Sequence, residues 1–404
     1  MSTTSGSEVS SNAQSFPTSG SALPPPSAAS RSGSTTSEQP ATSDSADGSN
    51  RQRKRKRKEE APLPAHKQPL YTPWLSAFKH NTEGTTEQRL HDEIDAYTKY
   101  ILPTPAEVTA RDKVIDRVEK VIMQRFRDAQ VHVYGSTRTN LSLPDGDIDV
   151  VIETKYVDTP NEKKSSLFQL RGRLQTDGIA ATALVVPGAR VPVLNMLSTP
   201  ETGSFNVDIS INGLDGVQTI DIVKSYLDAM PALRPLVLVI KGLLAQHGLH
   251  SAATSGLSSY AVICMAISFL QLNPANSPQE DMDSPASNRA LGILLMDFLK
   301  YYATDFPYTT SYISVTNKAL LIKADKGWDT GHADRLSIEC LVDPENDIAR
   351  SAGKMRQVRE LFQRSYDALC ERNAEVAEGG LLGRVVRISQ EVCSFSLLDA
   401  YSWH

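Results

Sequence analysis

The sequence predicts an α+β protein with a disordered N-terminal tail, a domain built on a mixed β-sheet, and a larger, mostly helical domain. Three observations lead to this prediction. Residues 1–50 are about one-third Ser and contain few large apolar side chains, so burial cannot offset their ordering entropy. Between about residues 104 and 215, amphipathic helices and strand-like apolar runs are mixed. Beyond Gly216 the apolar residues recur with helical spacing, and 404 residues are enough for two domains.

The predicted tail, residues 1–68, contains a dense basic run at residues 51–58. Seven of these eight residues are Lys or Arg, which is typical of a nuclear localisation signal or a nucleic-acid-binding patch. The alternative is a solvated run of charges in a linker. We favour the nuclear signal, because a soluble protein gains little from so dense a block. We therefore expect the protein in the nucleus or nucleolus.

The first domain, residues 104–215, is expected to open with an amphipathic helix that runs into a strand. Two later strands form a hairpin around Pro187–Gly188, because this dipeptide marks a turn. The predicted helices are 107–128 and 163–177, and the predicted strands are 131–134, 148–153, 183–186, 190–197 and 205–211.

After Gly216 the chain is expected to be almost wholly helical up to residue 385. The exceptions are a loop rich in Pro, Ser and Asp at 274–287 and an irregular stretch at 304–350. Residues 386–404 are predicted to be a short C-terminal tail. The predicted helices are 221–229, 233–247, 257–272, 289–301 and 353–370, with one more before the first domain at 90–101.

Three aspartates in the first domain form the pattern that points to chemistry. Asp147 and Asp149 are one residue apart, so on a strand they point to the same face. Asp208 lies inside a later apolar run, where a buried carboxylate needs a cation or strong hydrogen bonds. An Asp-x-Asp alone is common in turns and calcium loops. Three carboxylates on adjacent strands, however, could hold two Mg²⁺ (or Mn²⁺) ions for phosphoryl transfer.

Two further features fit the binding of phosphate groups. Gly135–Ser136 ends a predicted strand and opens a turn, where backbone N–H groups and a hydroxyl can hold phosphate oxygens. Alone, such a pair is usually only a turn. Lys241 interrupts the apolar run 236–240, and a lysine on a buried helix must reach a cleft or an anion unless it extends to the surface.

The order of Gly-Ser, Asp-x-Asp and a lone strand Asp resembles that of the DNA polymerase β-like nucleotidyltransferase superfamily. Residues 254–263 (TSGLSSYAVI) resemble the triphosphate- and base-binding helix start of the non-canonical poly(A) RNA polymerases. Residues 343–351 (DPENDIARS) resemble their nucleotide recognition motif. Residues 69–75 and 90–94 resemble the opening segment of the nuclear RNA-surveillance (TRAMP-type) branch. The resemblance covers about residues 69–385.

This resemblance implies a fold and a reaction. Residues 104–215 would form a nucleotidyltransferase palm domain, and residues 216–385 together with 69–103 a helical central domain. The nucleotide would lie in the cleft between them. The implied reaction is template-independent addition of AMP from ATP to RNA 3′ ends with two metal ions. Asp147 and Asp149 would bind both ions, and Asp208 would help to activate the RNA 3′-hydroxyl.

The resemblance also implies which residues bind the nucleotide. Ser259 would contact the terminal phosphate, Tyr260 would stack on the base, and Asn212 would bond the ribose. The alternative for Ser259 and Tyr260 is that this segment is a plain helix cap followed by a tyrosine of the core. Relatives often carry a second basic or polar residue one turn after Lys241, where this chain has Ala245. The full predicted nucleotide-binding set is Gly135, Ser136, Asn212, Lys241, Ser259, Tyr260, Asn346 and Arg350.

The choice of base is predicted from the recognition motif. Asn346 would read the base edge and Arg350 would brace the loop, although an Asx-turn with a helix cap also fits this spacing. Uridylyl-transferring relatives often have a His just before this Asn. The chain has Glu345 there, which favours adenine over uracil. A uridylyl- or mixed-specificity transferase and a non-catalytic scaffold remain as alternatives, the scaffold disfavoured because it has no need of three clustered carboxylates.

Charge and cysteine content bound the partners. The whole chain carries −5, and because residues 1–50 carry −3 and residues 51–60 carry +5, residues 61–404 carry about −7. An acidic body is a poor general binder of RNA. The resemblance implies a zinc-knuckle RNA-binding protein, an RNA helicase and a link to the exosome as partners. The four cysteines are far apart, with no readable zinc site, and no apolar run is long enough to span a membrane. We expect a reduced, intracellular, soluble protein.

Overall fold

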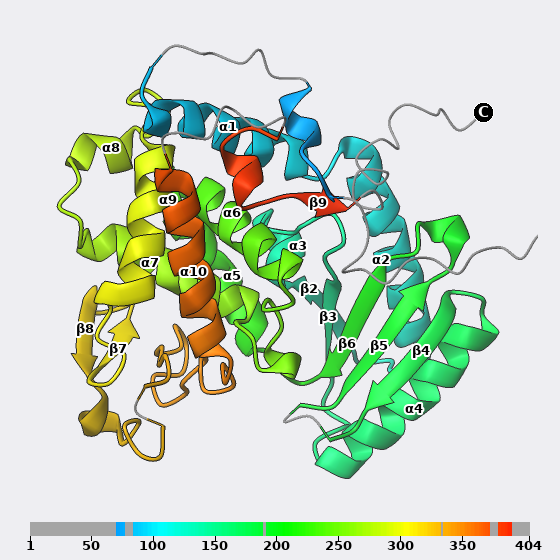
Figure 1. Ribbon diagram of the computed structural model, residues 1–404. Coiled ribbons are helices and arrows are strands. Elements are labelled where there is room, and N and C mark those ends of the chain that lie inside the picture. Colours follow the sequence, from blue (N-terminus) through cyan, green and yellow to red (C-terminus); the bar gives the residue numbers. More distant parts are fainter. Residues whose placement is uncertain (1–69, 77–83, 189–190, 333, 372–378, 390–404) are drawn as a thin grey trace, which may run out of the picture. The chain divides into compact units, whose positions relative to one another are not determined.

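The computed structural model describes residues 70–76, 84–188, 191–332, 334–371 and 379–389 (Figure 1). The predicted disordered tail, the basic run at 51–58, Cys393 and the stretch 390–404 lie outside the described residues. The fold is α+β, as predicted. A mixed five-stranded sheet and the helices between its strands form one part, and the rest of the described chain is mostly helical. No helix among the described residues is long and apolar enough to span a membrane.

The five-stranded sheet has the order β2-β3-β6-β5-β4. Only β3 and β6 run parallel, and the other neighbouring pairs are antiparallel. Figure 1 shows α2 and α4 on one side of this sheet. The strands are β2 (Gln130–Tyr134), β3 (Ile148–Glu153), β4 (Ala180–Val186), β5 (Val193–Ser198) and β6 (Asn206–Ile211), and the helices are α2 (Pro105–Arg125), α3 (Gly135–Thr139) and α4 (Pro160–Thr176).

Local signals explain where these helices begin. Thr104 and Thr159 act as N-caps, each accepting a hydrogen bond from a backbone N–H three residues on, and each is followed by Pro at the first helical position. Glu162 completes a capping box with Thr159. Strands β2, β3 and β6 fall at the predicted positions to within one residue, since their apolar alternation is bounded by polar turns.

The remainder of the described chain is mostly helical. Helix α1 precedes the sheet region in sequence but packs into the same core as the later helices, as expected for residues 90–101. The helices are α1 (Thr86–Ile101), α5 (Asp215–Ala229), α6 (Leu233–Gln246), α7 (Ser259–Leu272), α8 (Gln279–Asp283), α9 (Leu291–Lys300) and α10 (Met355–Cys370), with a π-helical turn at Tyr301–Asp305.

Two separate hydrophobic cores underlie these two regions. One core uses buried side chains from Val114 to Ile211, so we call α2 to β6 the sheet region. The other combines α1 and Leu141 with side chains from Val223 to Ile388, and we call α1 with α5 to β9 the helical region. The predicted division of the chain into domains at residues 104 and 215 stays a proposal.

Two predicted stretches differ from the structure. The stretch 304–350 is not wholly irregular, because β7 (Ser311–Ser314) and β8 (Ala319–Ile322) form a hairpin there. The turn that joins them holds Lys318 at a φ of 50°. Likewise, the predicted loop 274–287 contains the short helix α8.

The predicted C-terminal tail begins too early. Residues 379–389 fold back onto the start of the described body, where β9 (Ile388–Ser389) pairs with β1 (Leu70–Tyr71). The buried carboxylate of Glu93 on α1 accepts hydrogen bonds from the backbone N–H of Leu381 (2.9 Å) and of Leu382 (2.7 Å). A buried carboxylate needs such donors, which tie residues 381 and 382 to α1. The pairing of β9 with β1 then continues the folded body to Ser389, past the predicted boundary at residue 386.

Candidate active site

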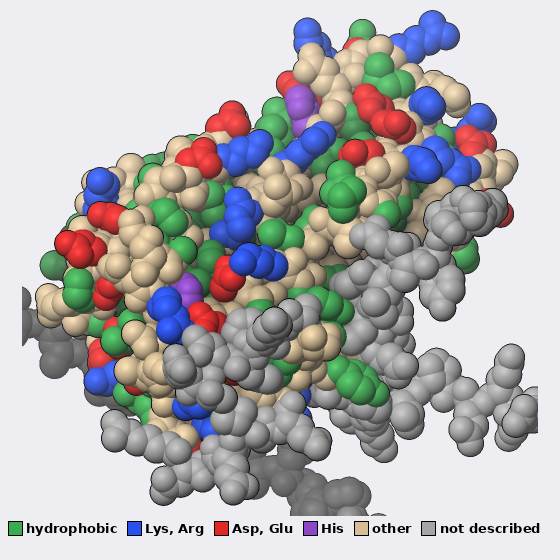
Figure 2. Space-filling view, turned by 90° about the horizontal axis from the view of Figure 1, so that it is seen from above, with side chains coloured by type: hydrophobic (Ala, Val, Ile, Leu, Met, Phe, Trp, Pro, Cys, Tyr) green, Lys and Arg blue, Asp and Glu red, His purple; other side chains and the backbone are tan. Residues whose placement is uncertain are grey.

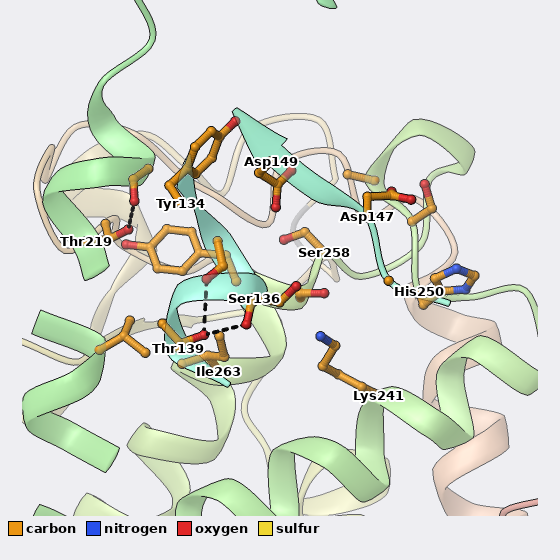
Figure 3. A pocket seen from close by; sticks show the side chains of 18 of the residues that line it. Tyr134, Ser136, Thr139, Asp147, Asp149, Thr219, Lys241, His250, Ser258 and Ile263 are labelled. Carbon is orange, nitrogen blue, oxygen red and sulfur yellow. Dashed lines mark hydrogen bonds between the residues drawn. The ribbon is translucent and has the colours of Figure 1, made fainter. Parts of the chain in front are cut away.

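A cavity of about 700 Å³ is lined by residues of both the sheet region and the helical region (Figure 3). It gathers eight of the eleven predicted site residues. The sheet region contributes Gly135, Ser136, Asp147 and Asp149, and the helical region contributes Lys241, Ser259, Tyr260 and Asn346.

Asp208 lies directly beside Asp149, on the neighbouring strand. The parallel register of β3 and β6 pairs these two residues, while Asp147 immediately precedes β3. Asp208 lines a second, smaller cavity of about 310 Å³, which also includes Asp147. The sheet therefore places the three aspartates together at the junction of the two cavities. Paired residues on neighbouring strands project to the same face, which is why the predicted juxtaposition follows from register.

Gly135 allows the turn after β2 to pass close to this carboxylate group. Its φ is +65°, which favours glycine, and a Cβ built on it would lie 2.2 Å from Oδ2 of Asp149. Ser136 follows in the short helix α3 and lines the cavity. Close approach of the Gly-Ser backbone to the carboxylates is thus possible only without a side chain at position 135.

Burial raises the pKa of all three carboxyl groups, and repulsion from neighbouring carboxylates adds to this for Asp147 and Asp149. Burial raises the pKa of Asp149 to about 7, with further contributions from Asp208 and Asp147. The pKa of Asp147 is raised by burial and by Asp208, and that of Asp208 by burial, partly offset by a hydrogen bond from Asn195. A site that crowds anionic groups in this way favours bound cations.

These residues fit divalent metal ions. Mg²⁺ and Mn²⁺ prefer carboxylate oxygens, and added positive charge would relieve the repulsion that raises these pKa values. Within the described ranges, no three carboxylate, His or Cys side chains converge on a single point. Asn195 Nδ2 donates to Oδ1 of Asp208 at 2.5 Å, which holds that carboxylate toward β5. Binding two ions would therefore need small rotations of these side chains.

Lys241 reaches the cavity from helix α6, opposite the sheet (Figure 3). It is only 7% exposed, and burial lowers its pKa to about 8, with an opposing effect of Asp149. Its Nζ donates to the carbonyl of Leu141 at 2.5 Å, and Arg234 of the same helix donates to the carbonyls of Thr139 and Asn140. Helix α6 thereby braces the turn that follows the Gly-Ser pair.

The start of helix α7 forms another part of the wall. Ser258 is the N-cap and accepts a hydrogen bond from Ala261 N at 3.1 Å, so Ser259 and Tyr260 occupy the first helical positions. The Tyr260 hydroxyl accepts a hydrogen bond from Leu341 N at 3.1 Å. The segment is therefore a helix cap, through Ser258, and it also lines the cavity, through Ser259 and Tyr260.

The recognition loop 343–350 is fixed by Asp347. Its Oδ1 accepts hydrogen bonds from Ile338 N and Ala349 N, both at 2.9 Å. Asn346 lines the cavity next to it. Glu345, the residue on which the prediction of adenine rested, points away: its side chain is 80% exposed and pairs with Lys326 at 2.5 Å. Of the two neighbouring residues, Asn346 and not Glu345 therefore lines the larger cavity.

Besides Asp208, two predicted residues do not lie in this cavity. Arg350 is exposed and lines a different cavity of about 680 Å³, and Asp347 rather than Arg350 braces the loop. Asn212 has a φ of 54°, and its amide bonds the backbone of Thr154 and Val157. This amide secures the end of β3, which argues against its predicted contact with a ribose.

Sequence reasoning missed several cavity residues. His250, Thr219 and Asp145 all line it, and Figure 3 shows His250 near Asp147. Asp145 adjoins the Asp-x-Asp and could have been noticed from its position. The other two lie in a loop and a helix that reach the cavity only through tertiary packing, so no local pattern marks them.

The described fold and the carboxylate site define a DNA polymerase β-like nucleotidyltransferase. Models of two families match the chain: "Poly(A) RNA polymerase, mitochondrial-like, central palm domain" over residues 90–228 and "Cid1 family poly A polymerase" over residues 290–348. The chain belongs to the non-canonical poly(A) RNA polymerase family, and it is homologous to the polymerases of TRAMP type.

The relatives support this assignment over most of the described body. The chain is 36% identical over 76% of its length to poly(A) RNA polymerase CID14 of Cryptococcus neoformans and 33% identical over 74% to cid14 of Schizosaccharomyces pombe. It spans only 40% and 42% of the lengths of these two proteins. It is 31% identical to the inactive protein Trf4-2 of Drosophila melanogaster, of which it covers 77%.

A solved structure gives the same result for the fold. The polymerase core of TRAMP, described as an RNA surveillance complex, is 26% identical, with a TM-score of 0.68, and the match covers 78% of this chain and 98% of that one.

Proposed function

We propose that this protein adds AMP from ATP to RNA 3′ ends without a template. The observation that carries the proposal is one cavity in which three kinds of group meet. Carboxylates lie on β3, phosphate-binding groups lie at Gly135–Ser136 and Lys241, and base-contacting groups lie at Tyr260 and Asn346. The family membership supports the same reaction class.

Each group has a defined task in this proposal. Ser136, Lys241 and Ser259 hold the triphosphate, since a hydroxyl, a cation and a helix start all favour phosphate oxygens. Tyr260 supports the base by stacking. Asp147, Asp149 and Asp208 hold two Mg²⁺ ions, which supply charge neutralisation and a lowered pKa for the attacking hydroxyl when bound. The 3′-oxygen attacks the α-phosphorus in line, and pyrophosphate leaves.

Asn346 is the residue proposed to select the base. An amide can donate to one atom of a base edge and accept from the next, a pairing that suits adenine. An amide can also be rotated to fit uracil, since its N and O exchange places. A uridylyl- or mixed-specificity transferase therefore stays as the second candidate.

A non-catalytic scaffold is the third candidate, because the relative Trf4-2 is described as inactive. The three carboxylates with raised pKa values weigh against it, since burying such a cluster without use destabilises a fold.

The test is primer extension with the purified chain, a labelled oligo(A) primer, Mg²⁺ and each of the four ribonucleoside triphosphates in turn. We expect extension with ATP far above UTP, and none in an Asp149→Asn control. A preference for UTP would favour the second candidate, and no extension by wild type under any condition would favour the scaffold.

The proposal extends to nuclear RNA surveillance with partners. On the face shown in Figure 2, basic and acidic side chains are interspersed. Residues 61–404 carry about −7, which supports weak binding of RNA by the chain alone. We expect that a zinc-knuckle RNA-binding subunit lowers the KM for RNA in primer extension at physiological salt. Strong processive tailing by the chain alone would contradict this.

The nuclear location is tested separately. Deleting residues 51–58 should move a tagged protein out of the nucleus and leave activity on a short primer unchanged. An unchanged nuclear signal would show that the basic run has another role, such as a contact with RNA.

A further inference from the structure

A single row of paired residues crosses all five strands of the sheet. Tyr134 pairs with Asp149, and Asp149 pairs with Asp208. Asp208 pairs with Asn195, and Asn195 pairs with Leu184 on the edge strand β4. Residues paired in register project to the same face of a sheet. The row therefore leads from the larger cavity, across the two carboxylates, to the second cavity.

The second cavity is the continuation of that row. Its lining includes Asp208, Asn195 and Leu184 of that row. It also includes the next row on the same face, two residues further along each strand, where Thr182 pairs with Leu197 and Leu197 with Asn206. Asp147 and Asn206 line both cavities. The carboxylates thus stand between two spaces, one of about 700 Å³ and one of about 310 Å³.

The two spaces differ in chemistry. The larger is also lined by carboxylates, Asp145, Asp147, Asp149 and Asp215, but it sets against them Lys241, the Gly135–Ser136 turn and the start of α7, all of which suit phosphates. The smaller has two carboxylates and no Lys or Arg among the described residues that line it. A phosphate would be repelled there, whereas a ribose or a base is uncharged. The smaller space therefore excludes a triphosphate and suits the sugar and base of a nucleotide.

In-line attack places the attacking oxygen and the leaving pyrophosphate on opposite sides of the reacting phosphorus, so each needs a space of its own. The leaving pyrophosphate lies with Lys241 in the larger cavity. The attacking 3′-hydroxyl must approach from the other side, and a 3′-terminal nucleotide has its only phosphate on the 5′ side, which can point away from the carboxylates.

Resting on the proposed function, we infer that the 3′-terminal nucleotide of the acceptor RNA is held in the smaller cavity by Leu184 and Asn195. Leu184 is 63% exposed and packs against the base of that nucleotide. Asn195 uses one amide proton on Asp208, which leaves its other proton and its carbonyl oxygen to bond the ribose or base. These residues select the acceptor end through uncharged contacts rather than through phosphate contacts.

The first experiment is steady-state primer extension with Leu184→Asp, measuring the KM for oligo(A) and for ATP separately. We expect the KM for RNA to rise about tenfold, since a charged, hydrated carboxylate cannot pack against the uncharged base as leucine does, with the KM for ATP unchanged. Val186→Asp is the matched control: Val186 is on the same strand and face, is 38% exposed, and does not line the cavity. An unchanged RNA KM in Leu184→Asp, or an equal effect of Val186→Asp, would overturn the inference.

The second experiment needs no turnover. An oligo(A) RNA ending in 4-thiouridine is bound to wild-type protein with Mg²⁺ and a non-hydrolysable ATP analogue, irradiated, and the cross-linked peptides are identified by mass spectrometry. We expect cross-links in β4 and β5. Cross-links only around the separate cavity at residues 327–350 would overturn the inference. If cross-links fall in β4 and β5 but no nucleotide is ever added, the proposed function fails while this site stands.

Discussion

The sheet wall and the helical wall of the candidate active site hold their functional groups in different ways. On the sheet wall, the backbones of Asp149 and Asp208 are paired by strand register, so neither backbone can shift without breaking the sheet, although the side chains can rotate. On the helical wall, Tyr260 and Asn346 depend on a helix start and on a loop tied together by a few hydrogen bonds. The groups proposed for chemistry are therefore on the rigid wall, and those proposed for selecting the nucleotide are on the adaptable one.

The largest effect should come from the centre of the sheet wall. Asp149→Asn removes a carboxylate from the proposed metal site while keeping its size, so nucleotide addition should fall by about 10³-fold or more. Primer extension under single-turnover conditions measures it. Near-normal activity would remove Asp149 from the metal site.

The same variant gives a second, independent reading through stability. The pKa of Asp149 is raised above that of an unfolded Asp, so without divalent metal the folded state gains stability below the unfolded pKa and loses it as pH rises toward 7. In EDTA at pH 8, Asp149→Asn should therefore melt higher than wild type. Mg²⁺ should raise the Tm of wild type and have less effect on the variant, as thermal unfolding would show.

Gly135→Ala should be the next most damaging change, because it acts on the same wall through the backbone. The new Cβ would clash with Asp149 and would be strained at a φ of +65°. A displacement of about 1 Å at a reacting group costs on the order of 10²-fold in rate. The control is Gly178→Ala, which has the same φ but open space around the Cβ. Equal activity of the two variants would show that the close approach is unimportant.

Lys241→Met tests the helical wall at the phosphate end. A hydrogen bond to a charged group contributes about 1.5–3 kcal/mol, so the KM for ATP should rise about 10- to 100-fold with a smaller change in the KM for RNA. The long apolar side chain of Met limits the loss of packing at this buried position. A change confined to stability would mean that Lys241 only braces the turn at Leu141.

The smallest effects should come from the base end of the helical wall. Asn346→Ala should lower kcat/KM for ATP about tenfold and reduce its ratio to the value for UTP, since the alanine reads neither base edge. Asp343→Ala, an exposed position in the same loop that does not line the larger cavity, is the control. An unchanged ATP to UTP ratio in Asn346→Ala would place the choice of base elsewhere.

The same contrast explains what the sequence could predict. The face shared by Asp147 and Asp149 follows from strand periodicity, and the position of Asp208 beside them follows once its run is read as a strand. The direction of Glu345 could not be read, because it depends on Lys326, a residue nineteen positions away in a separate turn. The hydrogen bonds of Asn212 could not be predicted for the same reason, since its partners at Thr154 and Val157 are distant in sequence.

The hairpin β7–β8 was missed for a different reason. Its strands have four residues each, too short for a periodic pattern to stand out from an irregular stretch. Residues 386–389 were taken for the start of a tail because the strand that pairs with them, Leu70–Tyr71, is more than three hundred residues earlier.

The pairing of β1 with β9 brings Tyr71 and Ile388 side by side, so the described body begins and ends at one place on its surface. Anything attached before residue 70 and anything attached after residue 389 is consequently tethered to the body at the same point. Neighbouring termini are also what circular permutation requires. A permuted chain that joins these ends through a short linker and opens at Pro187–Gly188 should keep the packing of both hydrophobic cores. Its new ends would lie after β4 at the edge of the sheet instead of at the β1–β9 pair.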